Sequence, residues 1–390
     1  MKKEDEKHIF VQHKFRFGGK TASEKVEEKI GKEIAEELAL RRDVAAFWIL
    51  NAQKATPNGG VSAWYHLDKG WCPASYPEVT GYIIPTFFDL YRITGDKEYY
   101  NAAMNMARWL LSIQLDDGSF TVMPGIWSTI ESKIPYVFDT GQVVAGLLRS
   151  WKETGKQDYL KAAEKAGLWI CSIQRGNGSF PLTPITNETH TYHTRVSWML
   201  LQLFEETGNE LFKEVAIKNL DWALTNKREN CWITPTPKEI THFIAYAVRG
   251  LLESGYILNN DRYILAAQCT ADKLLALQLE DGSLYGSYDS SWKPTTSSSC
   301  LTGNLQIAII WLRLYDITRN EKYISAAKKA VEYVSKTQSL TSTSPGVRGG
   351  IAGSNPIDGD YCPRMYLSWA TKFFIDAVNL LSKPDLKLSG

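Results

Sequence analysis

Two acidic residues occupy matching places in the chain and suggest shared chemistry. Glu78 lies in the phrase YPEVTGY and Asp139 lies in PYVFDTGQ, 61 residues further on, each at the start of an apolar segment. Hydrolysis of a glycosidic bond requires a pair of carboxyl groups, because one protonates the leaving oxygen while the other acts as base or nucleophile. We therefore predict that Asp139 is a proton donor and that Glu78 orients or assists water. The alternative role for each is stabilisation of a helix N-terminus.

A second constellation is rich in histidine. His190, Tyr192, His193 and Arg195 fall within the phrase THTYHTR, and His242 follows in EITHF. An arginine that neutralises a carboxylate, next to a histidine or tyrosine that moves a proton, is the chemistry of a uronate epimerase or lyase. His193 and His242 are thus candidate catalytic residues for that alternative. The competing interpretation is that these side chains contact substrate or cap helices.

Further polar and aromatic residues precede or begin the apolar segments, where they would contact a ligand. We expect aromatic rings to stack on sugar faces, and Arg195 and Arg364 to bind a carboxylate. Cys72, Cys300 and Cys362 also lie in these segments, but they lack the short spacing of zinc ligands, so neither a metal nor a cofactor is predicted. The remaining predicted substrate-binding residues are Trp71, Tyr76, Trp127, Gln142, His190, Tyr192, Trp292, Asn304, Gln306, Tyr361 and Trp369.

A repeated phrase indicates which elements position these residues. YYNAAMNMARWLLSIQLDDGSF, from Tyr99 to Phe120, recurs in related form from Tyr159, Tyr263 and Tyr323. Gln114 and Gln174 are 60 residues apart, as are Gln278 and Gln338. Self-similarity at a near-fixed period indicates one supersecondary unit stacked several times.

Two kinds of helix alternate along the chain. Six segments are apolar nearly all round, which is typical of helices buried on every side. Lys- and Glu-rich amphipathic helices follow five of them after short turns, so each pair is antiparallel. A long helix from about residue 23 to 53 is expected to pack on the sixth segment and close a ring. The apolar segments span 81–91, 140–151, 194–204, 244–254, 304–315 and 366–378.

The predicted fold is therefore all-α: an (α/α)6 toroid of six helical hairpins, in a single catalytic domain spanning residues 23–390. Residues 1–22 are predicted to be a tail or an outer wrapping segment. Long loops and the N-termini of the buried helices meet on one face, and function concentrates on such loops. Polar residues at six matching depths favour a wet cavity there over mutual pairing.

Composition excludes several classes of protein. The formal net charge is +1 and no long run of like charge occurs, which argues against nucleic-acid binding. No apolar stretch is long enough for a membrane helix. The start, MKKEDEKHIF, has basic residues but no apolar region behind them, so it is not expected to be a signal peptide. The six cysteines form no CxxC pair, so a reduced, cytoplasmic protein is expected. The oligomeric state stays open.

The hairpin phrases resemble the six-hairpin glycosidase superfamily over residues 40–385. Within it the chain looks most like unsaturated glucuronyl hydrolases, whose two acids at inner-helix starts match Glu78 and Asp139 in position. The barrel also resembles N-acylglucosamine and cellobiose epimerases, where histidines move the proton, and this resemblance implies that His193 and His242 could play such parts. GYIIPT and CLTGNLQ resemble proteins of surface-polysaccharide biosynthesis, and QLDDGSF resembles the structural QW motif of terpene cyclases.

The first hypothesis is a carbohydrate-active enzyme that hydrolyses an acidic, uronate-containing oligo- or polysaccharide with paired carboxylates. The alternatives are a uronate or sugar epimerase or lyase, a non-catalytic glycan-binding module, and a terpene-cyclase-like enzyme. The sequence leaves open the sugar, the linkage, the stereochemical outcome and the pathway.

Overall fold

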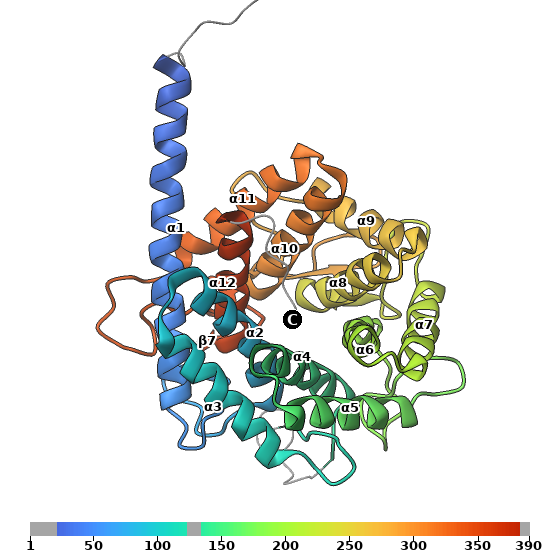
Figure 1. Ribbon diagram of the computed structural model, residues 1–390. Coiled ribbons are helices and arrows are strands. Elements are labelled where there is room, and N and C mark those ends of the chain that lie inside the picture. Colours follow the sequence, from blue (N-terminus) through green and yellow to red (C-terminus); the bar gives the residue numbers. More distant parts are fainter. Residues whose placement is uncertain (1–21, 123–133, 383–390) are drawn as a thin grey trace, which may run out of the picture.

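The structure is a computed structural model that describes residues 22–122 and 134–382. Within these ranges twelve α-helices account for most of the chain, as predicted (Figure 1). The predicted helix over residues 23–53 is α1 (Ala22–Lys54). The others are α2 (Pro77–Thr94), α3 (Lys97–Ile113), α4 (Val137–Thr154), α5 (Gln157–Ser172), α6 (Thr194–Thr207), α7 (Glu210–Thr225), α8 (Thr241–Ile257), α9 (Asp261–Ala276), α10 (Leu301–Thr318), α11 (Glu321–Thr337) and α12 (Ser368–Ser382).

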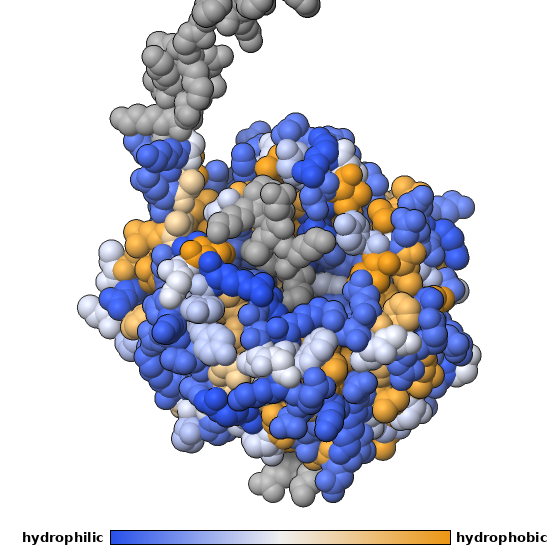
Figure 2. All heavy atoms as spheres, in the orientation of Figure 1, coloured by the Kyte–Doolittle hydropathy of each residue, from blue (hydrophilic) through white to orange (hydrophobic). Residues whose placement is uncertain are grey.

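The six apolar helices form a closed inner ring. Helices α2, α4, α6, α8, α10 and α12 each contact the next, and α12 contacts α2 again (Figure 1). Each inner helix packs on an outer partner, and α1 covers α12. The predicted (α/α)6 toroid and its closure by the N-terminal helix are thus confirmed. The inner helices are apolar because every side of them is buried, whereas the outer face in Figure 2 is largely hydrophilic.

Short turns join each inner helix to its outer partner. Gly95, Gly155 and Gly208 end α2, α4 and α6 in the left-handed conformation, with φ of 76°, 69° and 69°. Glycine adopts this conformation without a Cβ penalty, so the chain reverses within two or three residues. Asp96 and Asn209 then accept backbone N–H groups at the starts of α3 and α7.

The repeated glutamines fasten each outer helix to the next. Gln114 Nε2 donates to the carbonyl of Gly118 in its own loop and to that of Ala162 in α5, at 2.9 and 2.8 Å. Gln338 does the same at the closure, donating to Gly349 and to Arg41 in α1, at 2.8 and 3.0 Å. The structural role expected from the QW resemblance matches this geometry. Equivalent bonds come from Gln53, Gln174 and Gln278.

Other polar residues at the inner-helix starts hold the loops. Thr80, Thr140 and Thr371 accept the backbone N–H of a residue 19 or 20 positions upstream. Asn304 accepts the N–H of Leu284 in the same way, at 2.8 Å. The sequence argument that all such residues favour a cavity is therefore wrong for these positions, because loop backbone satisfies them.

Within residues 22–122 and 134–382, seven short strands lie in the long loops and form no central sheet. They form a three-stranded sheet in the order β2-β1-β7 and the pairs β3-β4 and β5-β6, all antiparallel. The strands are β1 (Trp64–His66), β2 (Gly70–Trp71), β3 (Lys238–Ile240), β4 (Ser287–Asp289), β5 (Ser299–Cys300), β6 (Ser354–Asn355) and β7 (Met365–Leu367). A short 3-10 helix, Thr191–His193, precedes α6.

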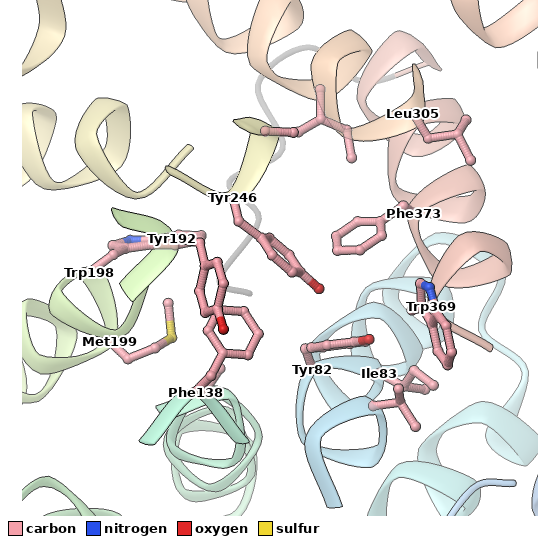
Figure 3. Packing of buried hydrophobic residues seen from close by; sticks show 14 of the residues in the cluster. Tyr82, Ile83, Phe138, Tyr192, Trp198, Met199, Tyr246, Leu305, Trp369 and Phe373 are labelled. Atoms are coloured by element: carbon pink, nitrogen blue, oxygen red, sulfur yellow. The ribbon is translucent and has the colours of Figure 1, made fainter. Parts of the chain in front are cut away.

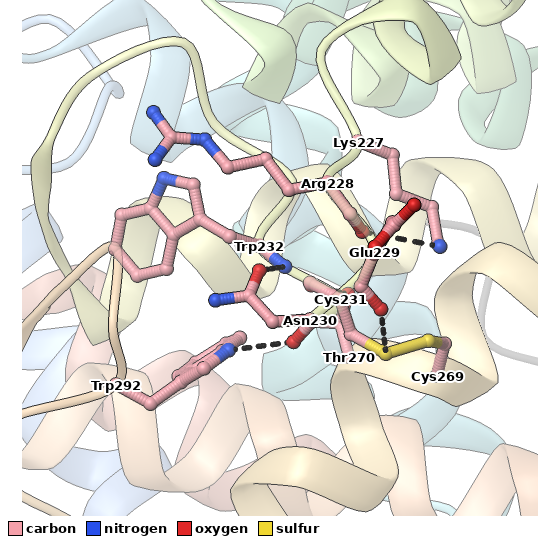
Figure 4. The surroundings of a disulfide bond; sticks show 9 residues. All are labelled: Lys227, Arg228, Glu229, Asn230, Cys231, Trp232, Cys269, Thr270 and Trp292. Carbon is pink, nitrogen blue, oxygen red and sulfur yellow. Dashed lines mark hydrogen bonds between the residues drawn. A yellow bond between two sulfur atoms is a disulfide. The ribbon is translucent and has the colours of Figure 1, made fainter.

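The loop after α7 is held differently from the others. Its Cys231 forms a disulfide with Cys269 in α9, 38 residues away, and Thr270 Oγ1 donates to the Cys231 carbonyl at 2.8 Å (Figure 4). This corrects the expectation that all cysteines are reduced. The position of the repeated glutamine is taken by Lys227, whose Nζ donates to the Arg228 carbonyl in its own loop. The disulfide thus takes the place of the glutamine bond between this loop and the next outer helix.

None of the helices in residues 22–122 and 134–382 combines the length and the apolar character that crossing a lipid bilayer requires. The predicted tail at residues 1–22 lies almost wholly outside the described residues, and the single catalytic domain stays a prediction.

The closure of the ring gives the first testable prediction. Gln338→Ala removes the hydrogen bonds to the Arg41 carbonyl of α1 and to the buried Gly349 carbonyl, and loss of the buried bond costs about 1–3 kcal/mol. We expect a lower melting temperature and faster amide exchange in α1 around Arg41. The matched control is Gln157→Ala, an exposed residue at the start of α5, which should change neither. Equal behaviour of the two variants contradicts the assigned role.

Candidate active site

A cavity of about 340 Å³ opens where the inner helices begin. Residues at or just before the starts of α2, α4, α6, α8 and α12 line it, which places it on the predicted face of the ring. Figure 3 shows aromatic rings surrounding the centre of the ring, with the hydroxyl groups of Tyr82 and Tyr246 pointing into it. The lining residues are Tyr76, Glu78, Tyr136, Phe138, Asp139, Leu182, Tyr192, His242, Phe243, Tyr246, Tyr361 and Trp369.

The structure brings the two predicted carboxyl groups into this one cavity. Glu78 stands in the first turn of α2 and Asp139 in the first turn of α4, neighbouring helices of the inner ring. The N-cap positions are Tyr76 and Tyr136, and neither makes a side-chain capping bond. The capping alternative therefore has little support in the geometry.

The surroundings of the two carboxyl groups differ. The Tyr76 hydroxyl donates a 2.6 Å hydrogen bond to Glu78 Oε2. Burial raises the pKa of Glu78 from 4.5 to about 7, against the lowering effects of Tyr76, Arg195 and Tyr246. Bonds of this kind favour the charged form of Glu78.

Asp139 is pushed more firmly toward its protonated form. It is 3% exposed, and its Oδ1 has no hydrogen-bond partner among the described residues. Burial raises its pKa well above the usual value, and the negative charge of Glu78 raises it further. Two carboxyl groups whose environments differ in this way are suited to separate acid and base roles.

His242 lines the cavity beside these carboxyl groups. The Gln306 amide Nε2 donates to His242 Nδ1, which leaves Nε2 to carry the ring proton in the neutral form. Burial, with a smaller effect from the Arg195 charge, lowers the pKa of His242 to about 3. His242 therefore offers a neutral N–H donor to a ligand and is poorly suited to abstract a proton.

The other predicted histidines do not line the cavity. His193 is fully buried, and burial lowers its pKa to about 3. His190 stacks on Tyr192 with ring centroids 4.5 Å apart, and its Nε2 lies 2.7 Å from a carboxylate oxygen of Glu188. The prediction that His193 acts on substrate is not supported by this placement, because Tyr192 stands on the cavity side.

Arg195 and Gln142 lie behind the cavity wall. Arg195 Nε donates to Gln142 Oε1 at 2.8 Å, and the guanidinium lies over the Tyr246 ring, 5.0 Å from its centroid. Arg195 is 1% exposed and Gln142 is fully buried. Neither contacts the cavity directly, which corrects their assignment as substrate contacts.

Two tryptophans predicted to stack on sugars are packed elsewhere. Trp71 lies against Trp48 and Tyr65, with ring centroids 4.9 and 5.2 Å apart. Trp292 lies against Trp232 near the disulfide and donates its indole N–H to the Asn230 carbonyl (Figure 4). The spacing of residues in the sequence did not reveal that both indole rings pack against other aromatic side chains instead of facing the cavity. Trp127 lies outside the described residues.

Three further predicted contacts also have other partners. The Asn304 amide binds the loop at Leu284, Ser299 and Cys300. Gln306 orients His242 from behind the cavity wall. Arg364 forms exposed ion pairs of 2.6 Å with Asp68 and 3.4 Å with Asp358, so its charge is already compensated. In contrast, Tyr76, Tyr192, Tyr361 and Trp369 line the cavity as predicted for substrate contacts.

Sequence reasoning missed several lining residues. Tyr136 and Phe138 flank Asp139 much as Tyr76 precedes Glu78, and Tyr246 lies one helical turn after His242, so local spacing carried a signal for these three. Leu182 comes from a loop and offers no such signal. Lys372 was also overlooked: it is fully buried in α12 and pairs with Asp376 at 2.7 Å, a pattern of i and i+4 charges inside an apolar segment.

The described residues contain no group of three or more His, Cys, Asp or Glu side chains arranged to hold a metal ion. Burial raises the pKa values of Cys300 and Cys362 to about 12, so both thiols are held protonated.

Comparison with known proteins places this geometry in context. Residues 79–276 match the protein family described as β-L-arabinofuranosidase, GH127 catalytic domain. That range includes Asp139 and His242 and begins one residue after Glu78. Among curated protein sequences, none is significantly similar to the chain.

Solved structures with the same fold process sugars. An unsaturated glucuronyl hydrolase specific for heparin is similar, with a TM-score of 0.73 and 14% identity over 90% of this chain and 98% of that chain. The unsaturated glucuronyl hydrolase from Bacillus sp. GL1 gives 0.71 and 17% over 90% and 97%. Cellobiose 2-epimerase from Bacillus thermoamylovorans B4167 gives 0.72 and 14% over 89% and 99%. At these identities the likeness shows the fold alone.

The raised pKa of Glu78 predicts a pH-dependent cost to stability. Below pH 4.5 the group is protonated in both states and costs nothing; as pH rises toward 7 the unfolded chain loses the proton first, so stability falls. Glu78→Gln removes this cost. We expect its melting temperature to be close to that of wild type at pH 4.5 and to exceed it at pH 8. The corresponding gain in the free energy of unfolding is at most on the order of 3 kcal/mol, at ~1.4 kcal/mol per pKa unit.

Thermal unfolding at both pH values measures the difference. Glu280→Gln, an exposed acid in a loop, is the control and should show no pH-dependent gain. A Glu78→Gln effect of the same size at both pH values would mean that Glu78 is not held in a protonation-sensitive environment.

Proposed function

This chain belongs to the family of the GH127 β-L-arabinofuranosidase catalytic domain, and on that premise we propose that it hydrolyses a glycosidic bond with Asp139 as acid and Glu78 as the group that assists water. That it is a carbohydrate-active enzyme follows from the family and from the fold it shares with sugar hydrolases and an epimerase. The reaction and the residue roles are the proposal.

One observation carries the proposal: two carboxyl groups share one cavity in unequal surroundings. Tyr76 donates a hydrogen bond that stabilises the Glu78 carboxylate, while Asp139 keeps an oxygen without a partner. Asp139 therefore retains its proton at a pH where Glu78 has begun to lose its own. A protonated acid beside an ionised base is the state that glycoside hydrolysis consumes.

The reaction then balances with these two groups. Asp139 gives its proton to the glycosidic oxygen as the bond to the anomeric carbon breaks. Glu78 accepts a proton from the water that supplies the new hydroxyl at that carbon. At the end Glu78 is protonated and Asp139 is ionised, so one proton must return to Asp139 before the next turnover. The Tyr76 hydroxyl interacts with both carboxyl groups and could relay this proton from Glu78 to Asp139.

The aromatic lining supports a sugar ring as the occupant. Tyr192, Phe243, Tyr361 and Trp369 offer flat apolar faces to the C–H groups of a sugar, and the neutral N–H of His242 is a donor for a hydroxyl. None of the described lining residues is Lys or Arg. A uronate carboxylate thus finds no direct cation in this part of the cavity, and a neutral sugar is the better fit.

The epimerase and lyase alternative fits less well. It needs a histidine that takes a proton from carbon, whereas His242 Nδ1 already accepts a hydrogen bond and His193 does not reach the cavity. The glycan-binding and terpene-cyclase alternatives predict no sugar turnover. The cytoplasmic location stays a prediction, and the Cys231–Cys269 disulfide argues against the reducing environment on which it was based.

A substrate panel in deuterated water separates these functions. The panel holds β-L-arabinofuranosides, unsaturated glucuronides, other neutral oligosaccharides and cellobiose. We expect new reducing ends with no deuterium on carbon, which indicates hydrolysis. Deuterium on carbon with the chain intact indicates epimerisation, and new ultraviolet absorbance indicates elimination; either contradicts the proposal. Glycan binding without turnover by the wild-type protein supports the binding module.

Asp139→Asn tests the assigned acid. Loss of general acid catalysis is expected to lower kcat by roughly 10²–10⁴-fold without lowering the melting temperature, because the N-cap of α4 is Tyr136 and an amide avoids the cost of burying an acid whose pKa is raised. Asp158→Asn is the matched control, since Asp158 is the acid in the first turn of α5 and lies outside the cavity. It should leave kcat unchanged. An Asp139→Asn variant that loses stability and activity in parallel would show that Asp139 is structural.

A further inference from the structure

Arg195 differs from the other buried cations of the described chain. It is 1% exposed, yet no carboxylate of the described residues lies within ion-pair distance of it. Burying an unpaired charge is costly, so such an arrangement requires compensation. The other buried cations all have a partner: Arg42 with Asp43, Arg149 with Asp89, Arg249 and Arg313 with Glu253, and Lys372 with Asp376.

The contacts of Arg195 place it between the helices that build the cavity. From α6 it donates to Gln142 on α4, the helix that carries Asp139. Its guanidinium lies over Tyr246 of α8, 5.0 Å from the ring centroid, and Tyr246 lines the cavity beside Glu78. The rings of Trp198 and Phe373 complete the enclosure at 5.5 and 5.6 Å. Nη2 has no hydrogen-bond partner among the described residues.

The charge of Arg195 reaches the two carboxyl groups unequally. It is one of the groups that lower the pKa of Glu78, whereas the pKa of Asp139 is set by burial, by Glu78 and by Tyr76. Water cannot screen the interaction, because Arg195 and the aromatic rings around it are buried. Two carboxylates act on Arg195: Asp376 of α12 and, across Tyr246, Glu78. Asp376 is already paired with Lys372 at 2.7 Å, so Glu78 is the remaining compensating charge.

We propose that Arg195 is a positioning residue that acts across Tyr246 to hold the negative charge on Glu78, and thereby leaves the proton on Asp139. The inference rests on the proposed hydrolytic function for its catalytic meaning, but the charge placement itself is independent of it. Gln142 fixes the guanidinium by accepting its Nε–H. Exchange of the acid and base roles is prevented because the cation acts, across Tyr246, on only one of the two carboxyl groups.

The competing interpretation is that Arg195 awaits the carboxylate of a uronate substrate. That interpretation requires the guanidinium to reach the cavity, and Tyr246 stands in between. The two differ in a measurable way: a carboxylate partner affects uronate substrates alone, whereas charge placement affects every substrate and also the free protein.

The first measurement uses the free protein and needs no turnover. Thermal stability is followed from pH 4.5 to 9 for wild type, Arg195→Met, and each of these combined with Glu78→Gln. In wild type the stabilising effect of Glu78→Gln is expected to grow from about pH 4.5, where the unfolded chain ionises, and to level off near pH 7. In the Arg195→Met background it should level off at least one pH unit higher and reach a larger value, because Glu78 ionises later without the cation. An unchanged levelling-off pH overturns the proposal.

The second measurement is the pH profile of kcat/KM on any substrate that the panel identifies. Arg195→Met should move the acidic limb upward by at least one unit, which is a tenfold loss at a pH on that limb, equally for neutral and uronate substrates. Arg195→Lys, which keeps the charge, should restore most of the profile. A loss confined to uronate substrates identifies a carboxylate-binding residue and refutes charge placement.

Two further variants separate the effect of the Arg195 charge from unspecific effects of losing an arginine and from misfolding. Arg262→Met removes an exposed arginine from α9 and should shift neither measurement. Should Arg195→Met fail to fold, Arg195→Gln takes its place, since it removes the charge and keeps a polar partner for Gln142. If no glycoside is turned over, the hydrolytic function fails while the stability measurement still decides where the charge lies.

Discussion

The structure depends on one constraint: six apolar helices must close into a ring. The last of them, α12, has no outer helix after it and is covered by α1 from the N-terminal part of the chain. Closure is what turns each inner helix so that its N-terminus meets the others at one face. It is fastened by amide side chains that bridge a loop carbonyl and the next outer helix, and the bridge from Gln338 to Arg41 joins the loop after α11 to α1. The first and last helices of the described chain therefore both belong to the ring that surrounds the cavity.

The apolar ring also sets the electrostatics of the cavity. Little water enters, so carboxyl groups that would ionise readily at the surface hold their protons, and imidazoles stay neutral. The barrel tolerates other buried charges because they are paired, such as Arg149 with Asp89 at 2.6 Å. Against that background the carboxyl pair and Arg195 stand out as groups whose charges are left to interact across the cavity wall.

How far the sequence predicted this follows from what spacing encodes. Period and apolar pattern record burial, so the twelve helices, the ring and the shared depth of Glu78 and Asp139 could all be predicted. Spacing does not record which way a loop side chain turns, and Trp292 and Asn304 were misassigned because loop packing and loop backbone claim them. Nor does it reveal contacts between loop and helix, so the pairing of Cys231 with Cys269 gave no sequence signal.

That disulfide stands at the junction of α7 and α9, where Lys227 takes the place of the repeated glutamine and bonds within its own loop. The neighbouring outer helices are joined by glutamine hydrogen bonds, which form whenever the chain folds. The Cys231–Cys269 bond, in contrast, requires an oxidant. A thiol-reducing medium would leave this loop to hydrogen bonds, among them those from Thr270 Oγ1 to the Cys231 carbonyl and from the Trp292 indole to the Asn230 carbonyl. The redox environment of the protein therefore decides whether this junction of the barrel is held by a covalent bond.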